Sequence, residues 1–153
     1  MKTVKIYSDG SCLGNGKSAN AGGYGVVMLY GKHKLELSEG YLNTTNNRME
    51  MLGAIAGLEM LKVPCKVELY TDSQYVIKGM NEWIKGWKAK GWMNSQRQPV
   101  KNRQYWERLD SVCQRHQVNW HWVKGHSGHP ENERCDLLAK TAAETATIPD
   151  SSD

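Results

Sequence analysis

An α/β fold with a mixed β-sheet is predicted by three features of this 153-residue sequence. Its amino-terminal third contains three successive segments of strand character, which predict an antiparallel meander. The hydrophobic spacing then changes to the helical period over residues 45–61. The remainder alternates short apolar segments with helical ones, an order typical of layered α/β folds.

The three amino-terminal strands are expected over residues 3–12, 22–30 and 33–42. In the first, Val4 and Ile6 alternate with polar neighbours, and the second is rich in β-branched and aromatic residues. In the third, leucines alternate with charged residues. Side chains of a strand point alternately to opposite faces, so this alternation is typical of strands with one buried face.

The first helix is expected over residues 45–61, although Gly53 and Gly57 weaken it by up to about 1 kcal/mol each. Its apolar face contains Met49, Leu52, Ala56 and Met60. The remaining segments predict a strand at 66–71, a helix at 73–90 that could break near a glycine, a helix at 103–116, a strand at 118–123 and a helix at 130–146. The last helix opens with Pro130 in its first turn, where proline is favoured.

The length fits one domain, expected over residues 1–146, and the polar residues 147–153 are expected to form a disordered tail. The four cysteines are far apart and form no C-x-x-C pair, which favours free thiols in a cytoplasmic protein. No stretch approaches the length of a membrane span. We therefore expect a cytoplasmic monomer with no membrane association and no obligate protein partner.

Positive charge is concentrated in one part of the chain. The net charge is +4, yet residues 78–103, the basic segment, contain seven Lys or Arg and one acid, Glu82, and so hold +6. The rest of the chain therefore sums to −2. A basic patch on a nearly neutral body is typical of a protein that binds a phosphate backbone.

Four acidic residues, each in its own short motif, are the candidate metal ligands. They are Asp9 in Asp-Gly-Ser, Glu50 in Asn-Asn-Arg-Met-Glu, Asp72 in Thr-Asp-Ser-Gln and Asp136 in Glu-Asn-Glu-Arg-Cys-Asp. Converging carboxylates repel one another, so convergence would indicate bound cations. Oxygen ligands suit Mg²⁺ or Mn²⁺, and two such ions can activate a water and stabilise the leaving oxygen of a phosphoryl displacement.

Each acid also has a purely structural interpretation. Glu50 could complete a helix capping box, and Asp72 could cap the helix that follows it. Asp136 could be an early-helix acid favoured by the helix dipole, and Asp9 could be a turn residue. Convergence of the four side chains would distinguish the metal site from these alternatives.

His126 is a candidate catalytic residue in the glycine-rich run of residues 123–129. Its unperturbed pKa lies near neutrality, so it could be a general base, a proton shuttle or an aid to product departure. The structural alternative is an ordinary loop histidine. A zinc site made by His126, His129 and Cys135 is disfavoured because these residues lack the paired spacing of structural zinc sites.

These motifs, in this order, resemble ribonuclease H of type 1, the enzymes that cut the RNA strand of an RNA/DNA hybrid. The resemblance runs from about Lys2 to about Glu144 and includes Gly-Gly-Tyr-Gly from Gly22 and Trp-Val-Lys-Gly-His from Trp122. It implies a ribonuclease H-like fold, with a five-stranded mixed sheet flanked by helices and a basic protrusion.

The resemblance also implies the chemistry. It indicates a magnesium-dependent endonuclease, with Mn²⁺ as a substitute, that holds two ions when substrate is bound. Asp9 would bridge the ions, and Glu50, Asp72 and Asp136 would complete their ligands. Cleavage would leave a 5′-phosphate and a 3′-hydroxyl, without strong sequence specificity.

Substrate contacts are implied by the same resemblance. Cys12, Asn15, Glu50 and Gln74 would lie near the RNA strand, Asn46 and Asn47 near the minor groove, and Thr45 near a DNA phosphate. Helix capping is the alternative role for the two neighbouring asparagines, and it does not exclude contact. Between Asn15 and Gly22 the chain is longer than is usual in the family.

The basic segment resembles the protrusion with which the family grips the DNA strand. Its candidate contacts are Trp83, Lys85, Lys88 and Lys90. Side-chain packing is the alternative for the tryptophans; it stays open for Trp83 and is favoured for Trp87. Lysine contacts with phosphates should give salt-dependent affinity with little sequence preference.

Two other functions stay open. A catalytically silent hybrid-binding module is the first, and the intact set of four acids argues against it. Another nuclease of the same broad fold, such as a resolvase or an integrase core, is the second. The basic segment and the Thr-Asn-Asn-Arg-Met-Glu run that ends at Glu50 favour ribonuclease H over this second function.

Overall fold

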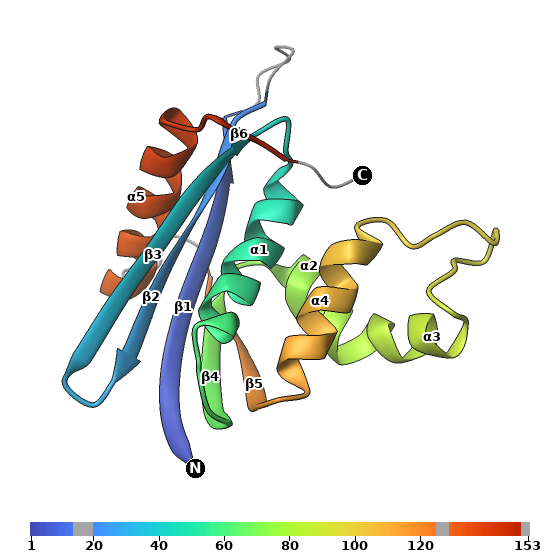
Figure 1. Cartoon of the computed structure of the whole chain (residues 1–153), viewed down its shortest axis with the longest axis horizontal. Helices are drawn as coiled ribbons and strands as arrows, with labels where there is room; N and C mark the ends of the chain where they lie inside the picture. The colour runs from blue at the N-terminus through green and yellow to red at the C-terminus, as the bar shows by residue number, and fades with distance from the viewer. Residues whose placement is uncertain (14–19, 125–128, 151–153) are drawn as a thin grey trace.

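A mixed sheet with the strand order β5-β4-β1-β2-β3-β6 forms the centre of the fold (Figure 1). The computed structural model describes residues 1–13, 20–124 and 129–150. Its strands are β1 (Lys2–Cys12), β2 (Gly22–Tyr30), β3 (His33–Leu42), β4 (Cys65–Thr71), β5 (Gln117–Trp122) and β6 (Ile148–Pro149). β1, β2 and β3 pair antiparallel, whereas β4 lies parallel to β1 and β5 parallel to β4. The predicted meander and mixed sheet are therefore confirmed.

Helices cover both faces of this sheet. They are α1 (Asn46–Glu59), α2 (Gln74–Lys78), the π-helical turn η1 (Gly79–Trp83), α3 (Ile84–Ala89), α4 (Arg103–Cys113) and α5 (Pro130–Glu144). Figure 1 shows α5 on one face, and α1 with α4 on the other. Within the described residues, no helix combines the length and the apolar character needed to cross a membrane.

The carboxyl-terminal residues differ from their prediction. Ile148 and Pro149 pair in parallel with Tyr41 and Leu42 of β3, which adds a sixth strand to the five expected. The backbone N–H of Asp150 donates to the carbonyl of Leu42 at 2.8 Å. Since β3 would otherwise leave backbone groups unpaired at the sheet edge, a short added strand satisfies some of them. The predicted disordered tail is wrong for residues 147–150, and residues 151–153 lie outside the described part.

The helix predicted over residues 73–90 continues through Gly79 instead of breaking there. α2, η1 and α3 follow one another without a loop, and the wider turn of η1 lies where Gly79 contacts the indole of Trp106. A β-carbon at position 79 would overlap that ring, so glycine permits the close approach of η1 and α4. The aromatic contact therefore explains a glycine that the sequence pattern alone marked as a potential break.

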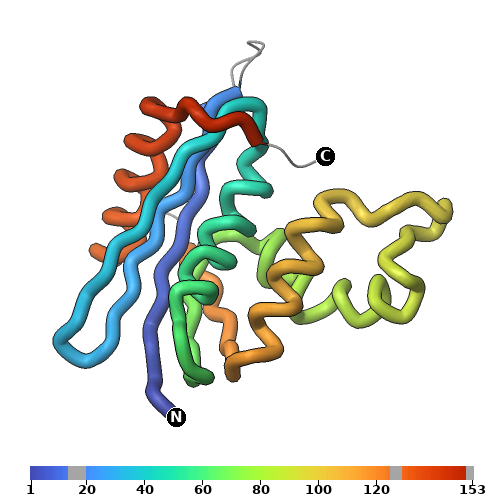
Figure 2. The backbone as a smooth tube through the Cα atoms, in the orientation of Figure 1, coloured from blue at the N-terminus to red at the C-terminus, as the bar shows by residue number. Residues whose placement is uncertain are grey.

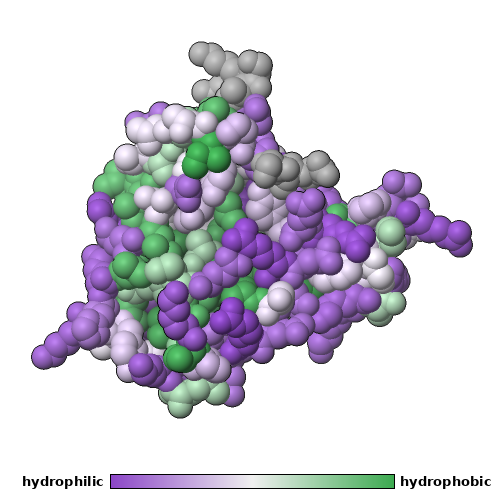
Figure 3. Space-filling model, in the orientation of Figure 1, coloured by the Kyte–Doolittle hydropathy of each residue, from purple (hydrophilic) through white to green (hydrophobic). Residues whose placement is uncertain are grey.

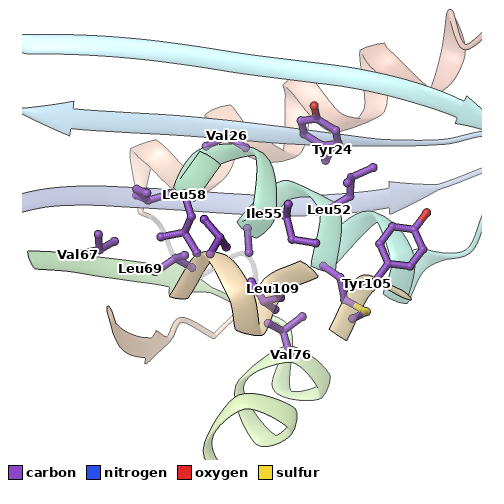
Figure 4. Close-up of a cluster of buried hydrophobic side chains, with 14 of the residues drawn as sticks. Tyr24, Val26, Leu52, Ile55, Leu58, Val67, Leu69, Val76, Tyr105 and Leu109 are labelled. Atoms are coloured by element: carbon purple, nitrogen blue, oxygen red, sulfur yellow. The ribbon is translucent and has the colours of Figure 1, made fainter. Parts of the chain in front are cut away.

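The main hydrophobic core lies between the sheet and α1 and α4 (Figure 4). Ile55 and Leu58 of α1 and Leu69 of β4 are fully buried, as is Trp106 of α4. A smaller cluster under α5 contains Tyr7, Val27 and Cys135. Burying a large apolar side chain contributes about 1.5–3 kcal/mol, so α1 is held firmly against the sheet. This anchoring matters because α1 also carries Glu50.

The basic segment extends away from the body of the protein (Figure 2). It comprises the end of α2, η1, α3 and the chain that leads to the start of α4. Figure 3 shows a mainly hydrophilic surface over this projection on the face in view. The predicted basic protrusion is thus present as a separate surface feature.

Candidate active site

Asp9 and Asp72 come together because their strands are parallel neighbours. Tyr7 of β1 pairs with Tyr70 of β4, and each chain reaches its aspartate two residues later. Parallel strands end at the same edge of a sheet, which is where sites of α/β proteins collect. The pairing of β1 and β4 therefore brings Asp9 and Asp72 together.

Glu50 reaches the same place from α1. Gly10, next to Asp9, allows this helix to lie against β1, because a β-carbon at position 10 would be only 2.5 Å from the backbone nitrogen of Glu50. Real β-carbons do not approach backbone so closely. The glycine in the Asp-Gly-Ser motif is therefore needed to bring the Glu50 side chain beside Asp9.

The three carboxylates converge. One oxygen from each of Asp9, Glu50 and Asp72 lies within 4.8 Å of the others. Asp9 is 9% exposed and Glu50 is 6% exposed. Burial, followed by the charges of Asp72 and Asp136, raises the pKa of Asp9 to about 8. Burial and then the charge of Asp9 raise the pKa of Glu50 well above its usual value.

Asp136 approaches the cluster from α5. Its charge and a hydrogen bond both contribute to the raised pKa of Asp9. One of its carboxylate oxygens lies 3.0 Å from the ammonium of Lys140, one helical turn later. Lys140 was not predicted as a site residue. The structure therefore adds a positive charge at the edge of the acidic cluster.

The donor set fits a divalent cation. Within the described residues, Glu50 Oε1 and Asp72 Oδ1 are buried without a hydrogen-bond partner. Buried polar atoms are almost always paired, so unpaired carboxylate oxygens on two residues of the same cluster indicate a missing partner. Clustered carboxylates with raised pKa values favour a cation, and an all-oxygen set suits Mg²⁺ or Mn²⁺.

The structural alternatives for the four acids are wrong. Asp9 lies within β1, where it pairs with Gly25 of β2, and is not a turn residue. Thr45 is the N-cap of α1, so Glu50 does not complete a capping box that begins two residues later. Ser73, not Asp72, caps α2, since its side chain accepts from the backbone of Val76 at 3.2 Å. Asp136 lies in the middle of α5, beyond its first turn. The acids are therefore brought together without serving as caps.

Comparison with known proteins gives a family. The ribonuclease H family model, "RNase H", matches residues 1–144 of this chain. The chain belongs to the ribonuclease H family. The protein is accordingly an endoribonuclease, a hydrolase.

Relatives match over nearly the whole length. The Ribonuclease H of Aeromonas hydrophila subsp. hydrophila is 59% identical over 143 residues, 94% of this chain and 91% of that protein. The Ribonuclease H of Pseudoalteromonas atlantica is 56% identical over 151 residues, 98% of this chain and 97% of its own length. The crystal structure of LC9-RNase H1, described as a type 1 RNase H with the type 2 active-site motif, aligns with a TM-score of 0.82 at 33% identity. That alignment covers 95% of this chain and 74% of the other.

Two predicted site residues of this ribonuclease H family protein, His126 and Asn15, lie outside the described residues. Zinc binding by Cys135 is further disfavoured, because its thiol is fully buried and lies 3.2 Å from the carbonyl of Tyr7 as a hydrogen-bond donor. Burial raises the pKa of this thiol to about 12. A zinc ligand needs a thiolate, so Cys135 fits a structural role.

Several predicted hybrid contacts of this ribonuclease H family protein lie within five residues of Asp9, Glu50 or Asp72 in the chain. Thr45, Asn46 and Asn47 are exposed at the start of α1, and Gln74 is exposed at the start of α2. Cys12 ends β1, and its thiol lies 3.8 Å from the carbonyl of Thr44. The acidic cluster thus lies on elements whose exposed ends carry the candidate contacts.

The tryptophans of the basic segment form an aromatic row. The ring centroids of Trp83 and Trp87 are 5.8 Å apart, and those of Trp87 and Trp106 are 5.3 Å apart. Trp87 is partly buried against the core, so its packing role is confirmed. Trp83 is 37% exposed while one edge of its ring contacts Tyr75, and it can therefore both pack and meet a ligand.

The three candidate lysines of the basic segment are exposed but not equivalent. The ammonium of Lys88 lies 3.0 Å from a carboxylate oxygen of Asp110 on α4. Lys85 and Lys90 have no ion pair within the described residues. An exposed ion pair is weak, yet it directs Lys88 toward the protein body. Lys85 and Lys90 are accordingly better placed for phosphate contact.

Proposed function

We propose that this protein hydrolyses the RNA strand of RNA/DNA hybrids with two bound Mg²⁺ ions, for which Mn²⁺ can substitute. The convergence of Asp9, Glu50 and Asp72 carries this proposal, because their oxygens are within 4.8 Å of one another and two of those residues keep a buried oxygen unpaired. Membership of the ribonuclease H family supports the choice of substrate.

The side chains of Asp9, Glu50, Asp72 and Asp136 would hold the ions. When bound, such ions lower the pKa of a water and offset charge on the leaving oxygen. The water oxygen would form a bond to phosphorus while the bond from phosphorus to the 3′ oxygen breaks. The products would be a 5′-phosphate and a 3′-hydroxyl.

His126 would act on protons near this centre, as general base, shuttle or aid to product departure. Lys140 would hold Asp136 in place through its 3.0 Å ion pair. Strand recognition would come from the amides at the start of α1 and from Gln74, which can read 2′-hydroxyl groups. The lysines of the basic segment would bind DNA phosphates and give little sequence preference.

The expected monomer and the cytoplasmic location stay predictions. Neither bears on the chemistry of the acidic cluster. The convergence of Asp9, Glu50 and Asp72 needs residues of one chain only, which supports a monomeric active unit.

Asp72→Asn tests the proposal, with Glu133→Gln as the matched control because Glu133 is an exposed carboxylate in the first turn of α5. Calorimetric titration with Mg²⁺ should show binding to the wild type and the control, and binding at least about tenfold weaker for Asp72→Asn. The same variant should lose cleavage by at least about 100-fold while it still binds the hybrid. Cleavage by Asp72→Asn at nearly the wild-type rate would show that Asp72 is not part of the active site.

A further inference from the structure

Asp150 connects three parts of the fold near the start of α1. Its Oδ2 accepts a hydrogen bond from the hydroxyl of Thr44 at 2.7 Å and lies 3.5 Å from the guanidinium of Arg48. Its Oδ1 accepts from the hydroxyl of Tyr105 at 3.0 Å. Figure 1 shows this carboxyl-terminal segment crossing from β6 toward the start of α1. One side chain therefore joins the loop before α1, α1 itself and α4.

The docking of this segment depends on polar contacts. Residues 147–149 are exposed, whereas the side chain of Asp150 is 3% exposed and that of Arg48 is 15% exposed. A buried carboxylate is stable only when it is paired, and removing one partner of a buried pair leaves the other uncompensated. Exposed residues 147–149 offer little apolar burial, so the segment is held by its backbone pairing with β3 and by the buried side chain of Asp150.

Arg48 extends the connection toward the basic segment. Its Nε donates to Oδ1 of Asn102 at 3.1 Å, and Nδ2 of Asn102 donates to the hydroxyl of Tyr75 at 3.2 Å. Asn102 is 7% exposed, directly precedes α4 and has a left-handed φ of 61°. The ring of Tyr75 in turn meets Trp83, with centroids 5.9 Å apart. A continuous set of contacts thus runs from the carboxyl-terminal segment to the basic segment.

The two surfaces joined in this way are the proposed contacts for the two strands of the hybrid. Residues 45–47 precede and begin α1, and the basic segment contains Trp83 and the candidate lysines. A duplex can meet both surfaces together only if their relative position is held, because ordering them during binding would reduce the affinity. Asp150 lies at the start of the contacts that hold them.

We propose that Asp150 is a positioning residue for substrate binding, an inference that rests on the proposed function. It orients Arg48, and through Asn102 and Tyr75 it keeps the start of α1 and the basic segment in the arrangement that a hybrid duplex needs. Glu50 is anchored independently, because α1 packs against Gly10 and the core beyond that point. Loss of Asp150 should therefore weaken binding much more than it slows the chemical step.

The test compares Asp150→Ala and Asp150→Asn with the control Glu144→Gln, which removes the charge of an exposed carboxylate at the end of α5. The assay is steady-state cleavage of a labelled RNA/DNA hybrid in Mg²⁺, with thermal unfolding to measure the folded fraction. Asp150→Ala should raise KM roughly three- to tenfold with kcat nearly unchanged. Asp150→Asn keeps one acceptor oxygen and should have a smaller effect, and the control should match the wild type.

Arg48→Ala, alone and combined with Asp150→Ala, tests whether Asp150 acts through its contact with Arg48. The two residues act through one contact, so the combined change in KM should be smaller than the product of the single changes. An unchanged KM in Asp150→Ala would overturn the proposal, including the case in which only the apparent kcat falls in step with the folded fraction. Hybrid binding in EDTA, followed by fluorescence anisotropy, separates this result from a failure of the proposed function. If the wild type bound hybrids but never cut them, the proposed activity would be refuted. The proposal for Asp150 would then still require Asp150→Ala to bind the hybrid more weakly than the wild type.

Discussion

Asp9→Asn is expected to stabilise the metal-free protein while it removes the activity. Burial, followed by the charges of Asp72 and Asp136, raises the pKa of Asp9 from 3.8 to about 8. An acid whose pKa is higher in the folded state stabilises that state when protonated. This contribution is fully present below a pH of about 4 and is lost as the pH rises toward 8.

The size of the effect follows from the same shift. At pH 7 Asp9 is mostly protonated in the folded protein and ionised in the unfolded chain, so folding must take up a proton. Neutral pH lies about three units above the unfolded pKa of 3.8, and each unit costs about 1.4 kcal/mol, so this proton uptake destabilises the fold by up to about 4 kcal/mol. The amide of the variant is also buried and needs hydrogen-bond partners, which offsets part of the gain. We expect a net stabilisation of about 2 kcal/mol, or a rise in Tm of about 4–8 °C for a chain of this length.

Thermal unfolding in EDTA, followed by circular dichroism at pH 4.5 and at pH 7, measures the effect. The gain of Asp9→Asn over the wild type should be large at pH 7 and should shrink at pH 4.5, where both the folded and the unfolded wild type carry more protons on Asp9. Mg²⁺ should raise the Tm of the wild type more than that of the variant. A variant that is less stable at pH 7, or a gain of equal size at both pH values, would refute the reasoning.

Three further changes have defined outcomes. Replacing Lys85 and Lys90 by alanine should raise KM and reduce the slope of log affinity against log salt by about 2, and an unchanged salt response would exclude them as phosphate contacts. Gly79→Ala places a β-carbon against the indole of Trp106 and should destabilise the fold by about 3 kcal/mol, measured by urea unfolding; a loss below about 0.5 kcal/mol would contradict this packing. His126→Ala should slow steady-state turnover about 100-fold without abolishing it, and an unchanged rate would return His126 to the role of an ordinary loop residue.

The sequence predicted the five long strands because each carries a repeating pattern over several residues, as Val4 and Ile6 do in β1. It did not predict β6, because a pair of residues is too short to show a period, and its pairing with β3 connects positions more than 100 residues apart. The π-helical turn was not predicted from the sequence either. The low helix propensity of glycine predicted that the helix could break at Gly79. In the structure, Gly79 instead lets the helix continue while it packs against the indole of Trp106.

The candidate site was largely predictable because the four acids lie in short motifs that resemble one family. Lys140 was missed, although its position four residues after Asp136 on a helix is a spacing at which opposite charges commonly pair. Asp150 could not be found in this way. Its contacts with Arg48 and Thr44 span 102 and 106 residues, and no local pattern marks a carboxylate that becomes buried only in the folded protein.

Cleavage of one labelled RNA, presented in turn as an RNA/DNA hybrid, a single strand and an RNA duplex, tests the central claim most directly. A labelled DNA duplex completes the set, and every substrate is incubated with Mg²⁺ or with EDTA and resolved on a gel. We predict metal-dependent cutting of the RNA in the hybrid alone, with 5′-phosphate ends. Binding of the hybrid without cutting would indicate a silent binding module, and cutting of duplex DNA would indicate a resolvase-like nuclease; either result would contradict the proposed function.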